Sequence, residues 1–107
     1  MLTPDQWTTI HNLTTWLDQQ NGRSQQEITL RILKLTEEAG EVAQAWIGTV
    51  GQNPRKGTTH TTADVADELV DVIVTATVAL TSITDQPETV LAHKLKAIAD
   101  RPRTPTT

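Results

Sequence analysis

Residues 24–47 read SQQEITLRILKLTEEAGEVAQAWI, and this stretch decides the fold of the chain. Its apolar residues recur at intervals of four, three, four, three and four, which is the repeat of one face of an α-helix. This apolar stripe consists of Ile28, Ile32, Leu35, Ala39, Val42 and Trp46. Ser24 and Glu27 have the spacing of a capping box, so we expect the helix to begin there.

Further apolar residues of the same helix lie away from the stripe, namely Leu30, Leu33 and Ile47. A helix that is apolar on two faces is expected to be buried on two faces. We therefore expect one face to meet the rest of the subunit and the other to meet a second chain.

Three more helices are expected around this one. The first opens at residues 3–6, where Thr3 and Gln6 form a capping box around Pro4, and it ends at Asn21 and Gly22. The third starts at Thr61 or Thr62, after a loop over residues 48–60. The last starts near residues 85–88, which read as another capping box.

The third helix contains a β-branched run at residues 72–75 that would suit a strand. Its apolar residues nevertheless extend from Val65 to Ile83 without a turn signal, which exceeds an ordinary strand, so a helix is predicted. The expected fold is an all-α, four-helix bundle. Residues 1–100 are expected to form one domain and residues 101–107, rich in proline and threonine, a disordered tail.

The composition narrows the class of protein. Only 36% of the 107 residues are hydrophobic and the three tryptophans are the only aromatic residues, so the core is thin and a second subunit would enlarge it. The absence of cysteine excludes disulfides and thiolate metal sites. A net charge of −4 argues against binding a nucleic acid polymer. Neither a signal peptide nor a membrane span is recognisable, so a cytoplasmic protein is expected.

Two pairs of acids carry the functional argument: Glu38 with Glu41, and Glu68 with Asp71. Residues three apart share one face of a helix, so each pair can direct two carboxylates at one point. If the second and third helices pack face to face, four carboxylates converge, with Glu37 as a fifth. Unpaired charge is costly to bury, and a hard divalent cation with oxygen ligands would compensate it.

The alternative is that these acids are ordinary solvated surface residues. Lys34 is the only basic residue within a helical turn of the acids at positions 37, 38 and 41, and no basic residue lies near Glu68 or Asp71. Like charges at this spacing destabilise an isolated helix, which favours the metal site.

The sequence Glu37-Glu38-Ala39-Gly40-Glu41, a spacer of 26 residues and then Glu68-Leu69-Val70-Asp71 resembles the EExxE…ExxD signature of MazG-like, all-α nucleotide pyrophosphohydrolases. The likeness extends over roughly residues 25–101. It implies a MazG-like bundle completed as a homodimer or homotetramer. It also implies hydrolysis of a (deoxy)nucleoside triphosphate to the monophosphate and pyrophosphate, in a role of removing unwanted nucleotides.

The resemblance also implies roles for individual residues. Glu38, Glu41, Glu68 and Asp71 become ligands of Mg2+, for which Mn2+ is a substitute. Glu37 becomes a further ligand or the group that orients the attacking water, so Glu37 and Glu38 are the catalytic candidates. A carboxylate can accept the proton of that water.

Residues that contact the substrate are less sharply indicated. Relatives hold phosphates with basic residues after the third helix, where Lys94 is the first candidate here, followed by Lys96 and Arg101. Arg55 and Lys56 in the loop could close over the phosphates.

The nucleobase needs a flat apolar contact, for which Trp46 is the candidate, with Trp7, Trp16 and His11 as alternatives. Two other functions remain open. One is a dUTPase-like or dCTP-specific branch of the same superfamily. The other is a non-catalytic helical module for dimerisation or nucleotide sensing. A purely structural bundle is a third possibility.

Overall fold

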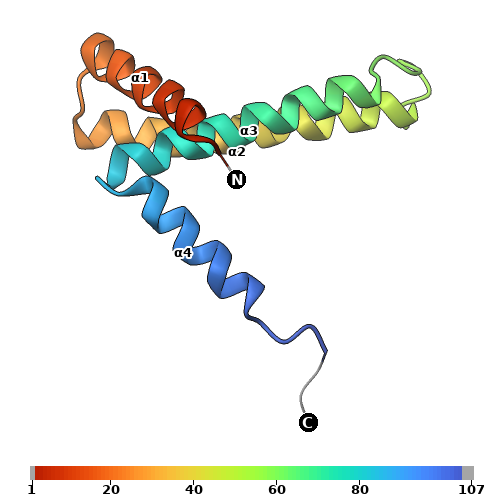
Figure 1. Cartoon of the computed structure of the whole chain (residues 1–107). Coiled ribbons are helices and arrows are strands. Elements are labelled where there is room, and N and C mark those ends of the chain that lie inside the picture. The colour runs from red at the N-terminus through yellow and green to blue at the C-terminus, as the bar shows by residue number, and fades with distance from the viewer. Residues whose placement is uncertain (1, 105–107) are drawn as a thin grey trace.

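The computed structural model describes residues 2–104, which form four α-helices and no strand. These are α1 (Pro4–Asn21), α2 (Gln25–Val50), α3 (Thr62–Ile83) and α4 (Pro87–Ala99). α2 and α3 lie side by side as a long antiparallel hairpin, α1 packs against α3 near one end of it, and α4 diverges from that same end (Figure 1). The expected all-helical architecture is confirmed. Of the tail expected to be disordered, residues 105–107 lie outside the described residues.

The helix starts follow the sequence at three of four positions. Thr3 and Thr61 each form a reciprocal capping box, the latter with Asp64, whose pKa is lowered by the hydrogen bond from the Thr61 backbone amide. Ser24 accepts a hydrogen bond from the Glu27 amide, but the Glu27 carboxylate turns to other partners instead of completing a box.

The capping box expected for the last helix is wrong. Gln86 occupies the N-cap position without a side-chain hydrogen bond. The Glu88 carboxylate contacts the imidazole of His11 on α1 at 2.5 Å, which lowers the pKa of Glu88. A partner on another helix has therefore replaced the local one.

The β-branched run at residues 72–75 is helical, as its length predicted. Hydroxyl side chains in the same helix donate to backbone carbonyls one turn earlier, as Thr77 does to Ile73 and Ser82 to Val78. None of the four helices is long and apolar enough to cross a membrane, among the residues described.

The core of the single chain is small. Trp7 and Ile10 of α1 pack with Val78 of α3, and Leu17 and Leu91 lie at the edge of this cluster. The radius of gyration is 17.3 Å, whereas a compact domain of about 100 residues has a value of about 13 Å. The chain is therefore open rather than compact.

Many large apolar side chains are exposed in one chain, among them Ile32 and Trp46 of the apolar stripe on α2. They lie on α2, α3 and α4 and include Leu30, Ile32, Leu33, Trp46, Ile47, Leu69, Ile73, Ile83, Val90, Leu95 and Ile98. The periodicity correctly located the apolar stripes, but it does not specify whether the same chain covers them. Within one chain the large buried apolar side chains lie at the end of the hairpin where α1 packs, and Ala45 is a small buried residue further along α2.

A buried arginine that the sequence reading missed ties this end of the hairpin together. Arg31 is 6% exposed and donates to Glu27 at 2.8 Å, to Asp18 at 2.9 Å and to the Ser82 hydroxyl at 3.0 Å. Although burial disfavours its charge, these two carboxylates hold the pKa of Arg31 above its ordinary value. The neighbouring Arg23 donates to the last carbonyls of α3.

Candidate metal centre

The antiparallel pairing of α2 and α3 brings the two acid motifs together about halfway along the hairpin. One carboxylate oxygen from each of Glu38, Glu41 and Glu68 lies within 4.8 Å of the others. Glu38 and Glu41 are three residues apart on α2, so they share a flank that faces Glu68 on α3. The convergence that the spacing predicted is thus present for three of the four proposed ligands.

Two of these carboxylates are incompletely satisfied. The Oε2 atoms of Glu38 and Glu68 are buried and have no hydrogen-bond partner among the described residues. The single cation close to this cluster in the described chain is Lys34, whose Nζ lies 3.6 Å from the other oxygen of Glu38. Buried polar atoms normally have partners, so an oxygen-seeking cation fits this donor set.

Asp71 and Glu37 lie at the margin of the cluster. Asp71 is exposed and lies one turn beyond Glu68, about 60° away around the α3 axis at roughly 100° per residue. Glu37 is exposed and lies about 40° from Glu41 around α2 by the same geometry. Neither belongs to the tightest group. Both lie on the open flank of the hairpin, next to the three converged acids.

The structure does not bring the proposed basic ligands after α3 to the acids within one chain. Lys94 is exposed on α4, and Arg101 follows that helix, which runs away from the hairpin (Figure 1). Lys96 pairs with Asp100 at 3.1 Å on the surface. Arg55 and Lys56 are exposed at the opposite end of the hairpin, in the loop between α2 and α3.

The proposed base contact, Trp46, lies on the other flank of α2. It is 52% exposed and lies about 140° from Glu41 around the helix axis, at roughly 100° per residue. Among the alternatives, Trp7 is buried in the core and His11 contacts Glu88. Trp16 is 56% exposed on α1 and lines an apolar pocket.

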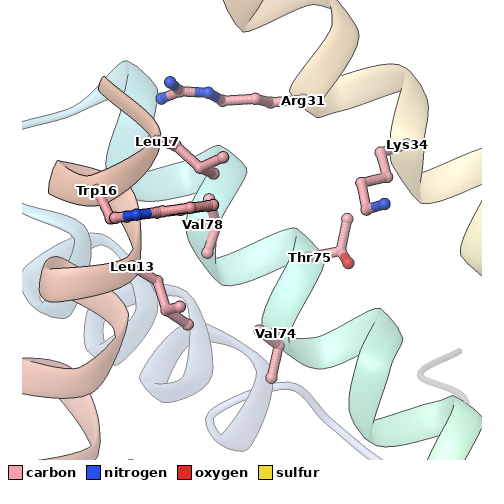
Figure 2. A pocket seen from close by; sticks show the side chains of 8 residues that line it. All are labelled: Leu13, Trp16, Leu17, Arg31, Lys34, Val74, Thr75 and Val78. Carbon is pink, nitrogen blue, oxygen red and sulfur yellow. The ribbon is translucent and has the colours of Figure 1, made fainter. Parts of the chain in front are cut away.

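This pocket has a volume of about 200 Å³ and lies between three helices (Figure 2). Leu13 and Trp16 project from α1, Val74 and Val78 from α3, and Lys34 from α2 closes the side nearest the acids. Lys34 therefore borders both the pocket and the acid cluster. Local sequence patterns carry no direct signal for this pocket, because its walls come from segments that are about 60 residues apart.

Comparisons of the chain with protein-family models, with curated proteins and with solved structures gave no match. The interpretation of the site therefore depends on its own geometry and on the acid motifs.

Proposed function

We propose that this chain is a Mg2+-dependent nucleotide pyrophosphohydrolase that converts (deoxy)nucleoside triphosphates to monophosphates. In this reaction water attacks the α-phosphorus and the bond from that phosphorus to the oxygen bridging to the β-phosphorus breaks. The products are the nucleoside monophosphate and pyrophosphate, and the attacking water releases one proton. Removal of unwanted nucleotides is the role that this activity would serve.

The observation that carries the proposal is the buried oxygen on each of Glu38 and Glu68 that has no hydrogen-bond partner among residues 2–104, in two carboxylates that converge with that of Glu41. Structural acids in the same chain, such as Glu27, have cationic partners. In the acid cluster Lys34 lies 3.6 Å from one oxygen of Glu38, and the other oxygen of that carboxylate stays without a partner among the described residues. Buried acceptors without partners are typical of a ligand site. Glu38, Glu41 and Glu68 would hold the ion, with Asp71 completing the set. When bound, Mg2+ would neutralise the triphosphate and favour the water nucleophile.

Glu37 is the residue best placed to accept the proton. It is exposed on the flank of α2 that carries Glu41, and no hydrogen bond or ion pair occupies it in the described structure. A carboxylate beside the ligands but outside their closest group can orient the water while the ligands remain bound to the ion.

The apolar pocket beside Lys34 supports a nucleotide as the substrate. Trp16 offers an exposed indole face, and Leu13 and Val74 add flat apolar surface, as a nucleobase requires. In this proposal Trp16 replaces Trp46 as the base contact within one chain.

The uncovered apolar flank supports assembly with a second copy. Ile32 and Trp46 of α2 and Leu69 and Ile73 of α3 are all about half exposed, and they lie on the flank opposite the open side of the acid cluster. Neighbouring exposed apolar side chains of this kind are typical of an interaction site. A homodimer or homotetramer would bury it and leave the acids accessible.

The activity is tested with a panel of NTPs and dNTPs, with and without Mg2+, by measuring the release of pyrophosphate and of orthophosphate. Pyrophosphate should appear only with Mg2+, and Glu68→Gln should lower the rate of hydrolysis at least about 100-fold. Mutating a residue that only supports a metal ligand lowers activity by up to about 100-fold, and loss of a ligand itself should have at least that effect. Asp100→Asn, which alters an exposed acid on α4, is the matched control and should keep full activity. Release of orthophosphate would refute the proposed bond cleavage.

A further inference from the structure

A second pocket lies at the tip of the hairpin, where α2 ends and the loop returns toward α3. Its volume is about 420 Å³, which is within the usual range for small-molecule sites. Its wall combines the last turns of α2 with loop residues on both sides of Gly57. It is separate from the apolar pocket at the other end of the hairpin.

The chemistry of this wall suits an anion. Lys56 supplies a cation, and the His60 imidazole and the Thr59 hydroxyl lie 2.9 Å apart beside it. Three amide side chains complete the polar lining, namely Gln44, Gln52 and Asn53. No acid is among the described residues that line it. A pocket with donors and a cation but no carboxylate selects negative ligands in a protein whose net charge is −4.

A glycine inside α2 lets the loop that lines this pocket pack directly against the helix. Gly48 was expected to begin the loop, but α2 continues to Val50. A Cβ at position 48 would lie 2.2 Å from Nδ1 of His60 and 2.4 Å from Oγ1 of Thr59. The Gly48 carbonyl accepts a hydrogen bond from the Thr59 amide at 2.9 Å. The loop is therefore held directly on the helix backbone.

The backbone of Lys56 is also held in place by hydrogen bonds within the loop. The Asn53 carbonyl accepts from the amides of Lys56 and Gly57 at 3.1 Å and 2.9 Å, and the Asn53 side chain accepts from the Arg55 amide at 3.0 Å. Gly51 and Gly57 supply the positive φ angles that this tight return requires. Lys56 is thus presented by an ordered turn.

The pocket opens on the same flank of the hairpin as the acids. Taking roughly 100° per residue, Gln44 lies about 60° and Gly48 about 20° from Glu41 around α2. At roughly 1.5 Å per residue, Gln44 lies about 4.5 Å further along the helix than Glu41. The wall of the pocket therefore starts one turn beyond the acid cluster.

Three sites then follow one another along this flank: the apolar pocket at Lys34, the acids, and the pocket at the hairpin tip. We propose that the juxtaposition of Lys56, His60 and Gln44 with the acid cluster forms the subsite for the β- and γ-phosphates and for the released pyrophosphate. This inference rests on the proposed function. It assigns the direction of the substrate, with its base toward Trp16 and its terminal phosphate toward the loop.

Inorganic pyrophosphate is the probe, because its binding can be measured without turnover. Isothermal titration of the full chain in the presence of Mg2+ should show binding, and Lys56→Gln should weaken it about tenfold, as expected for loss of a hydrogen bond to a charged group. Gln44→Glu, which is isosteric but negative, should also weaken it. Arg103→Gln removes an exposed cation beyond α4 and is the control that should bind as the native chain does.

The outcomes separate this inference from the proposed function. Equal pyrophosphate affinity in the native chain and in the Lys56→Gln and Gln44→Glu variants, or no binding by the native chain, overturns the subsite whether or not nucleotides are hydrolysed. Binding that depends on Lys56 in a chain without hydrolytic activity supports the subsite and refutes the pyrophosphohydrolase. Melting temperatures of the variants should match that of the native chain, because both side chains are exposed.

Discussion

Two regions of the hairpin contain buried charged groups, and they differ in whether those groups have hydrogen-bond partners. At the end covered by α1, Arg31 is surrounded by two carboxylates, a hydroxyl and the Gly22 carbonyl. At its middle, Glu38 and Glu68 each keep a buried oxygen that has no partner in the part of the chain that the structure describes. The first arrangement is complete within the chain and therefore serves the fold. The second is incomplete among the described residues, and this difference is the basis of the proposed cation site.

The largest expected effect comes from breaking the complete network. Arg31→Met should lower the free energy of unfolding by about 3 kcal/mol, because Glu27 and Asp18 would be left beside an apolar side chain. Denaturant unfolding monitored by circular dichroism measures this change. Lys34→Met, one turn further along α2 and more than half exposed, is the control and should lose far less. Equal losses would mean that Arg31 is no more important than a surface cation.

A smaller effect is expected from filling the incomplete site. Mg2+ at ten times its dissociation constant should stabilise the folded chain by about 1.4 kcal/mol, because binding to the native state alone shifts the equilibrium. Thermal unfolding with and without Mg2+ measures this, and Glu38→Gln should abolish the gain. A melting temperature that Mg2+ and nucleotide leave unchanged would favour a purely structural bundle.

The smallest effect concerns pH. The hydrogen bond from Arg31 holds the pKa of Glu27 below its ordinary value of 4.5. Its contribution to stability is therefore fully present above pH 4.5 and is lost as the pH falls through the folded pKa. The difference in free energy of unfolding between the native chain and Glu27→Gln should shrink as the pH is lowered from 7 to about 3. A difference that stays constant would show that protonation of Glu27 is not linked to folding.

The sequence predicted what depends on local spacing. The helical repeat located all four helices, and the cap residues marked three of their starts. The interval of three between Glu38 and Glu41 anticipated their convergence with Glu68, whereas Asp71 lies outside this closest group. Length correctly outweighed the β-branched run at residues 72–75. These features are encoded within one or two helical turns.

Contacts between segments that are distant in the sequence could not be predicted from local spacing. The partners of Arg31 come from α1, from the start of α2 and from α3, and only Glu27, four residues away, gave a local signal. The contact between Glu88 and His11 displaced a capping box that the local pattern favoured. Both pockets have walls from separate segments. The prediction that Trp46 contacts the base failed within one chain for a different reason. Its angle to Glu41, which places it on the other flank of α2, was available from the helical repeat alone.

The two glycines inside α2 make unequal demands on any future variant of this chain. A methyl group at Gly40 would meet nothing within 4 Å, so alanine there should be tolerated and should favour the helix by about 1 kcal/mol. The same methyl group at Gly48 would collide with the Thr59 and His60 side chains. Sequences that keep this hairpin tip can thus carry alanine at position 40, whereas any side chain at position 48 would force Thr59 and His60 to move.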